Sequence, residues 1–214
     1  YSTLQNNTGV VVEILPADSW LNIVLNLLSP VLEDQRIRRA LQMALDHEAI
    51  MLAAFGKGFY ELTPELVPGA PIWYSDAGRE FFNVNDPEGA KALLTEAGFP
   101  DGFETKITVS TGVILGSNEM AQVWAQDLAE VGIKAEIEEK DQALFFDDYF
   151  AGNFGIQAYT LGDGTVDPAI YLANNSPLRT ENNTCGIETQ EFFEEYAAAL
   201  HRPRQPSRTW PKRG

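Results

Sequence analysis

Helix patterns that end in a glycine and lead at once into a strand pattern constrain the fold of this chain more than any other feature. One helix is predicted to begin at Asp86, a capping carboxylate followed by proline, and to end at Gly98. An alternating strand pattern follows over residues 105–111. A second unit of this kind begins at Ser117, ends at Gly132 and runs into another alternating strand. Helices and strands that alternate in this way predict an α/β domain with helices covering a sheet.

The remaining elements follow from the same reasoning. Residues 10–15 are apolar and rich in valine, which predicts a buried strand. Helical spacing extends over residues 32–55, where Asp46 is placed to cap a second helix that ends at Gly56. Three further elements are predicted towards the C-terminus: a helix at 143–150, a strand at 154–161 and a last helix at 190–200.

The charge of the chain excludes two classes of partner. Among 214 residues there are 31 acidic and 15 basic side chains, giving a formal net charge of −16. A field this negative repels phosphate backbones and anionic lipid surfaces, so we expect no nucleic-acid partner. Apolar residues make up 44% of the chain, which is too many for a disordered acidic protein.

Residues 201–214 differ in composition from everything before them. They hold five basic side chains and no acid, which leaves the first 200 residues with a formal charge of −21. Proline and arginine occur here without any periodicity. We expect an aberrant basic tail that is a disordered end or a frameshift or cloning scar.

Catalytic motifs are not visible in the sequence. There is no Gly-x-Ser-x-Gly elbow and no phosphate-binding loop, and Cys185 has no histidine beside it. We therefore expect a protein that is not an enzyme and needs no cofactor and no metal. The exception is the glycine-rich loop with Asp163 and Asp167, whose carboxylates suit either helix capping or a hard cation. A metal-assisted hydrolase using this pair stays open as an alternative, as does a sensor domain.

Four segments of the chain resemble one protein family. They are SPVLEDQRIRRALQMALDHEAIMLAAFGKG, NDPEGAKALLTEAGFPDGF, EMAQVWAQDLAEVGIKAEIEE and GNFGIQAYTLGDGTVDP. All four are similar, in the same order, to segments of the bacterial extracellular solute-binding proteins of family 5, the oligopeptide, dipeptide and nickel receptors of ABC importers. The resemblance covers about residues 10–200.

The resemblance implies a fold and a function. It implies a periplasmic-binding-protein-like lobe with a central mixed sheet flanked by helices. Residues 10–200 would form a ligand-binding C-terminal lobe, and residues 1–9 would lie near the crossing to a missing N-terminal lobe. The two lobes would close on a small-molecule or peptide solute by a hinge and deliver it to an ABC-transporter permease in the membrane. The protein would be periplasmic or extracellular, either free or held by a lipid anchor.

The resemblance also implies a ligand-binding site. One part would be the loop that opens the second helix unit, whose backbone amides could meet an anionic group or simply begin the helix. The other parts would be the last strand and the loop after it. The expected contact residues are Gly116, Ser117, Asn118, Tyr159, Thr160, Leu161, Asp163 and Gly164.

This chain departs from the family pattern at three places. The aspartate that pairs with a peptide's α-amino group would stand at Gly164, whereas the nearest carboxylate here is Asp163, one position earlier. The family's frequent tryptophan is Leu161 here, and its Asp-Arg pair is Asp46-His47. A peptide and a different solute, such as a sugar, an opine or a metal chelate, both remain open.

Overall fold

A mixed four-stranded sheet forms the centre of the described part of the computed structural model. The structure describes residues 20–64, 78–112, 116–161 and 189–201, together with residues 4, 9–13, 76, 185 and 186. The strands are β1 (Trp20–Leu25), β2 (Glu104–Ser110), β3 (Lys134–Lys140) and β4 (Ile156–Leu161), in the order β1-β4-β2-β3. β4, β2 and β3 are parallel and β1 is antiparallel to β4, which confirms the α/β fold with a mixed sheet.

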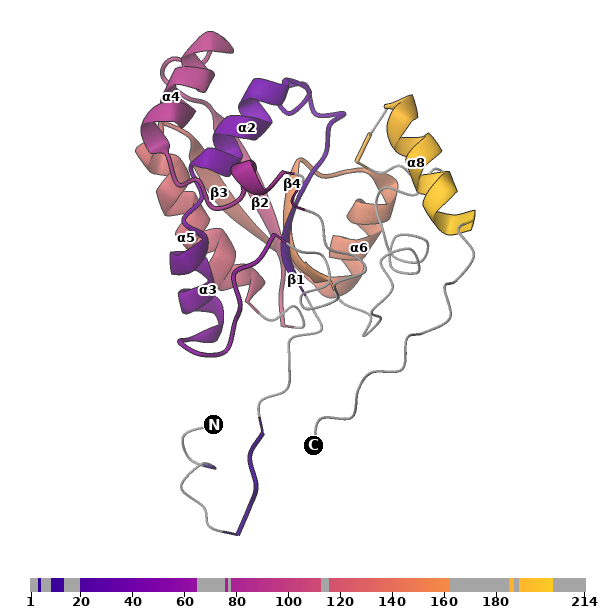
Figure 1. Ribbon diagram of the computed structural model, residues 1–214. Helices are drawn as coiled ribbons and strands as arrows, with labels where there is room; N and C mark the ends of the chain where they lie inside the picture. The colour runs from indigo at the N-terminus through magenta and orange to yellow at the C-terminus, as the bar shows by residue number, and fades with distance from the viewer. Residues whose placement is uncertain are drawn as a thin grey trace.

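Helices cover both faces of this sheet. Figure 1 shows α2 to α5 on one side and α6 on the other. A short 3₁₀ helix, η2 (Arg79–Phe81), precedes α4. The α-helices of the described residues are α2 (Gln35–Met43), α3 (His47–Phe55), α4 (Pro87–Glu96), α5 (Ser117–Glu130), α6 (Gln142–Ala151) and α8 (Gln190–His201).

The main core lies between the sheet and the α2–α5 layer. Ile107 and Val109 of β2 are fully buried there, and Trp124 and Leu128 of α5 pack into the same cluster. Ile156 of β4 is paired with Ile107 and adds to it. Because successive strand residues point to opposite faces, the alternating apolar residues predicted from the sequence form the face of the sheet that packs against these helices.

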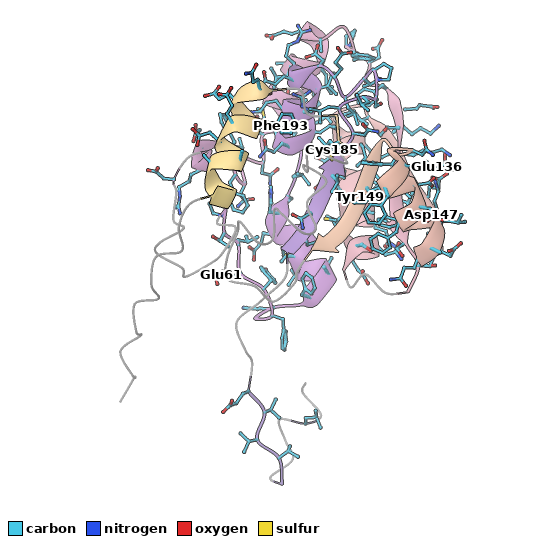
Figure 2. The ribbon with its side chains drawn as sticks, turned by 90° about the vertical axis from the view of Figure 1, so that its right-hand side faces the viewer. Glu61, Glu136, Asp147, Tyr149, Cys185 and Phe193 are labelled. Atoms are coloured by element: carbon cyan, nitrogen blue, oxygen red, sulfur yellow. The ribbon has the colours of Figure 1, made fainter. Side chains whose placement is uncertain are left out.

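A smaller aromatic cluster lies on the opposite face, under α6. Phe145 and Tyr149 of α6 are buried, and the ring of Tyr149 stacks on Phe154 with 5.8 Å between centroids. Figure 2 shows Tyr149 on the inner side of this helix and Asp147 at the outer surface. The sheet is therefore buried on both faces where α6 crosses it.

Capping contacts confirm the predicted helix limits. Asp86 accepts a hydrogen bond from the Gly89 amide at 2.9 Å, with proline at the first position of α4. Gly98, just beyond this helix, has a φ of +94°. Asp46 likewise accepts from the Ala49 amide at 2.9 Å and begins α3. A short polar side chain at the start and a residue free to adopt positive φ at the end define these helices.

The predicted strand at residues 10–15 is wrong in its described part. Residues 10–13 have no strand structure, and Val11 is 90% exposed. The first strand of the sheet is instead β1, whose end is fixed by Asn26: its amide Nδ2 donates to the carbonyls of Gly152 at 2.9 Å and Phe154 at 2.8 Å. Residues 10–15 and β1 are both apolar, so composition does not distinguish them. A strand is stable only when it pairs with another strand, and β4 pairs with β1.

A carboxylate contact joins α3 to α5. Asp127 Oδ2 accepts from the backbone amide of Asp46 at 3.0 Å. Burial, together with the nearby charges of Asp46 and Glu130, raises the pKa of Asp127 above the usual value, although the amide hydrogen bond acts in the opposite direction. The negative charge is thus disfavoured at this position in the folded chain.

Replacing Asp127 by asparagine is expected to raise the melting temperature at pH 7. Asparagine keeps an oxygen acceptor for the Asp46 amide and removes the disfavoured charge. Because the folded pKa lies above the unfolded one, the aspartate stabilises best in acid and loses that contribution as pH rises. The gain should therefore vanish below about pH 4. Thermal unfolding at pH 7 and below pH 4 measures this difference in melting temperature. Asp101→Asn is the control, because it removes the same charge from an exposed turn. A lower melting temperature for Asp127→Asn at pH 7 would contradict this account.

Candidate functional site

The carboxyl-terminal edge of the parallel strands brings two of the predicted site segments to one end of the sheet. β2 and β4 run in parallel and so end at the same edge, where the short connection after β2 also starts α5. β1 runs in the opposite direction and contributes its first residues, with Trp20 paired to Leu161 and Asn22 to Tyr159. In open α/β sheets, ligands bind at this edge.

Gly116 is the residue from which α5 begins. Its φ is +82° and no side chain caps the helix. A Cβ atom at this position would lie 2.9 Å from Phe55 Cζ and 3.1 Å from the Cβ of Ala54, so the end of α3 covers Gly116. Only glycine combines this backbone conformation with so close a neighbour. The structure thus explains Gly116 by the packing of α3 on α5.

The next two residues differ in accessibility. Ser117 is buried and has packing or polar contacts of its own. Asn118 is half-buried, and its Oδ1 atom is enclosed without accepting a hydrogen bond. A buried acceptor without a donor costs free energy, which a water molecule or a ligand group can relieve. Of the three predicted residues at the start of α5, Asn118 is the one with an enclosed acceptor that lacks a donor.

The other predicted site residues are placed less fully. Tyr159, Thr160 and Leu161 are the last residues of β4, and their backbone is fixed by pairing with β1. Their side chains lie outside what the structure describes, as do Asp163, Gly164 and Asp167. Their contacts with a solute therefore stay predictions.

Two buried polar residues of the parallel strands were not predicted from the sequence. Ser110, the last residue of β2, and Gln157 of β4 are buried, and neither Ser110 Oγ nor Gln157 Oε1 has a hydrogen-bond partner. Gln157 Nε2 donates to the Phe145 carbonyl at 3.4 Å, so this side chain faces α6. The signal in the sequence was a polar side chain inside a predicted strand. Alternation of apolar and polar residues does not reveal that both faces of this sheet are buried, so the burial of these side chains could not be predicted.

The positive charge at the end of β3 is already neutralised. Lys140 Nζ lies 2.7 Å from Asp148 and 3.1 Å from Glu138. The hydrogen bond that Lys140 donates to Asp148 is the main cause that raises the pKa of Lys140 above its ordinary value. A ligand anion would have to compete with two carboxylates for this ammonium group.

No metal site is formed by the described residues. Within those ranges, no three histidine, cysteine, aspartate or glutamate side chains gather closely enough to hold a metal ion. The same part of the chain contains no helix with the length and apolar character needed to cross a membrane.

Comparison with known families decides what kind of chain this is. Residues 1–182 match the model of the bacterial extracellular solute-binding proteins, family 5, middle part. The chain belongs to this family. The resemblance inferred from the four sequence segments is thereby confirmed, and family 5 consists of solute-binding proteins rather than enzymes.

Individual relatives show the same likeness. Di/tripeptide-binding protein 2 of Pseudomonas aeruginosa is 31% identical over 147 residues, which are 67% of this chain and 27% of that protein. The glutathione-binding protein GsiB of Salmonella choleraesuis is 27% identical over 92% of this chain and 39% of its own length. A dipeptide-binding protein of Pseudoalteromonas sp. SM9913, solved with Met-Leu, has a TM-score of 0.73 at 22% identity, over 93% of this chain and 40% of that one.

These matches confirm the fold and define the extent of the chain. The structural likeness shows a periplasmic-binding-protein fold. Proteins of family 5 are extracellular or periplasmic. The chain spans between about a quarter and two fifths of the length of the relatives it matches.

Proposed function

We propose that this chain is a ligand-binding lobe of an ABC-importer receptor that captures a small solute by closing two lobes around it. The observation that carries the proposal is the family match over residues 1–182. The receptor would hand its solute to a permease in the membrane and would work in the periplasm or outside the cell, with a lipid anchor as one possible attachment.

The sheet edge is the part of the described structure that supports this role. It gathers the start of α5 and the end of β4 at one end of the domain, where Asn118 Oδ1 has no hydrogen-bond donor. Such an edge can form one wall of a binding cleft, and closure of a second lobe would supply the other wall.

A peptide-like solute is the class that the relatives favour. Two of them are named for di- or tripeptides and for glutathione, which is itself a short peptide. In the sequence, Asp163 is the carboxylate nearest to Gly164, the position at which the family's aspartate would pair with an α-amino group. The pairing of Lys140 with Asp148 and Glu138 leaves little positive charge for a solute that is only anionic.

Thermal-shift measurements on the longer receptor that contains this chain test the function. Dipeptides, tripeptides including glutathione, sugars and metal chelates would be compared. Peptides are expected to raise the melting temperature, since a solute at about 100 times its Kd adds roughly 2.7 kcal/mol of stability. The 214-residue chain alone should respond little, because it offers one wall of the cleft. The proposal would be overturned if no solute class shifted the receptor, or if the lobe alone bound as tightly.

A variant of Asn118 separates the site from the fold. In the longer receptor, Asn118→Ala should weaken solute binding several-fold with little change in melting temperature without solute. Glu130→Gln, at the far end of the same helix, is the matched control and should leave affinity unchanged. Equal affinities for both variants would remove Asn118 from the site.

A further inference from the structure

The segment from Arg79 to Asp86 is held against α2 and α3 by a small set of contacts. The Arg39 guanidinium of α2 lies 3.9 Å from the centroid of the Phe81 ring. The imidazole of His47, the first residue of α3, packs on Phe82 with 4.8 Å between ring centroids. The Asp86 amide donates to the carbonyl of Met43 at 2.8 Å. We call residues 79–86 the docked segment.

The backbone of the docked segment depends on these contacts. Asn83 and Asn85 have φ values of +51° and +43°, in the left-handed region that asparagine enters more readily than most other residues but still at a cost relative to glycine. Such conformations persist where surrounding contacts hold them in place. Loss of one anchoring contact therefore favours release of the segment.

His47 is the anchoring residue that can change its charge near neutral pH. Its ring is half-buried, and its Nδ1 atom is enclosed without a hydrogen-bond partner. A proton added to Nδ1 would become a buried donor, which costs free energy. Burial lowers the pKa of His47 below the ordinary 6.5, although the Leu45 carbonyl, the Asp46 charge and the Asn83 side chain oppose that shift. The neutral imidazole is thus the form that fits the docked arrangement.

The charges around His47 come from four parts of the chain. Its own helix and cap supply Asp46 and Glu48, and α5 supplies Asp127 through its hydrogen bond to the Asp46 amide. The docked segment and α2 add the remaining ionisable groups, namely Arg79, Glu80, Asp86 and Arg39. Of these charges, Asp46 is the one that acts on the ring, where it favours the proton, and desolvation of the ring outweighs it.

We propose that His47 is a pH-sensitive latch: its neutral ring holds the docked segment on α2 and α3, and its protonation releases the segment. The latch concerns this lobe alone and does not depend on which solute the receptor binds. The equilibrium constant for docking falls as pH drops below about 6.5, the ordinary pKa of a released histidine. The decrease is up to tenfold for each pH unit and stops once the docked ring is itself protonated.

Nuclear magnetic resonance of the 214-residue chain tests the latch. The chain has only two histidines, so the imidazole signals of His47 can be assigned with a His201→Gln variant. The His47 signal should titrate below pH 6.5, and the amide signals of residues 81–83 should move with the same midpoint. Amide exchange in this segment, corrected for its intrinsic pH dependence, should be faster at pH 5 than at pH 7.5.

Three variants make the outcome decisive. His47→Gln, which keeps a polar side chain that cannot titrate, should abolish the pH dependence of residues 81–83, whereas His201→Gln should leave it intact. Phe82→Leu should move the His47 midpoint towards 6.5, because a smaller side chain covers the ring less. The proposal fails if the wild-type segment is insensitive to pH, or if the pH response survives in His47→Gln.

Discussion

The Gly102→Ala variant is expected to lose about 3 kcal/mol or more of its free energy of unfolding. Gly102 lies in the turn between α4 and β2, where its φ is +75°. A Cβ atom at this position would overlap the carbonyl group of Gly132, in the turn between α5 and β3. The obstacle is backbone, which cannot swing aside as a flexible side chain can. The two turns would have to separate, and with them the start of β3, where the Lys134 amide donates to the Phe103 carbonyl at 2.9 Å.

Urea denaturation of Gly102→Ala beside Gly98→Ala measures this effect. Gly98 also has a positive φ, of +94°, but no atom lies within 4 Å of the position its Cβ would take. Gly98→Ala therefore pays only the conformational cost of a non-glycine residue, about 1–2 kcal/mol. Similar losses in the two variants would show that the turns do not need their close approach.

Removal of the Trp124 side chain is the second large effect that the structure predicts. Trp124 is 1% exposed and lies in the main core between α5 and the sheet. Truncation to alanine removes a large apolar group and leaves a cavity, at a cost of about 3–5 kcal/mol. For a domain whose whole stability is commonly about 5–15 kcal/mol, a large share of the chain would then be unfolded at 37 °C. Circular dichroism during urea titration measures the loss.

Trp124→Phe distinguishes packing from hydrogen bonding. The Nε1 atom of Trp124 is buried without a hydrogen-bond acceptor, so phenylalanine would remove an unsatisfied donor while keeping most of the apolar volume. We expect a loss of about 1–2 kcal/mol, well below that of alanine. A phenylalanine variant as unstable as the alanine variant would mean that the indole N–H does form a stabilising contact.

The helices could be predicted from sequence because their limits depend on nearby residues. Asp86 caps α4 through an amide three positions away, and Gly98 follows the helix directly. The first strand could not be assigned in the same way. Residues 10–15 and β1 are both apolar, and only pairing with β4 decides which of them becomes a strand. Trp20 meets Leu161 across the sheet, and no local pattern carries information over such a separation.

The candidate site was predictable only in outline. The order of strands and helices brings the start of α5 and the end of β4 to one edge, while their contacts with a solute stay predictions. It did not reveal that α3 covers Gly116, nor that Ser110 and Gln157 are buried polar residues. Those properties come from contacts between elements distant in sequence. The same holds for His47, which packs against Phe82 from another segment of the chain.

The antiparallel pairing of β1 with β4 imposes an order of events on synthesis. Asn26, at the end of β1, bonds to the carbonyl of Phe154, 128 positions further along the chain. At roughly 5–20 residues per second, translation takes several seconds to cover that distance. During this interval β1 leaves the ribosome without its partner, and its apolar side chains remain available to chaperones. The β2–β3 unit can assemble first, and closure of the sheet by β1 comes last.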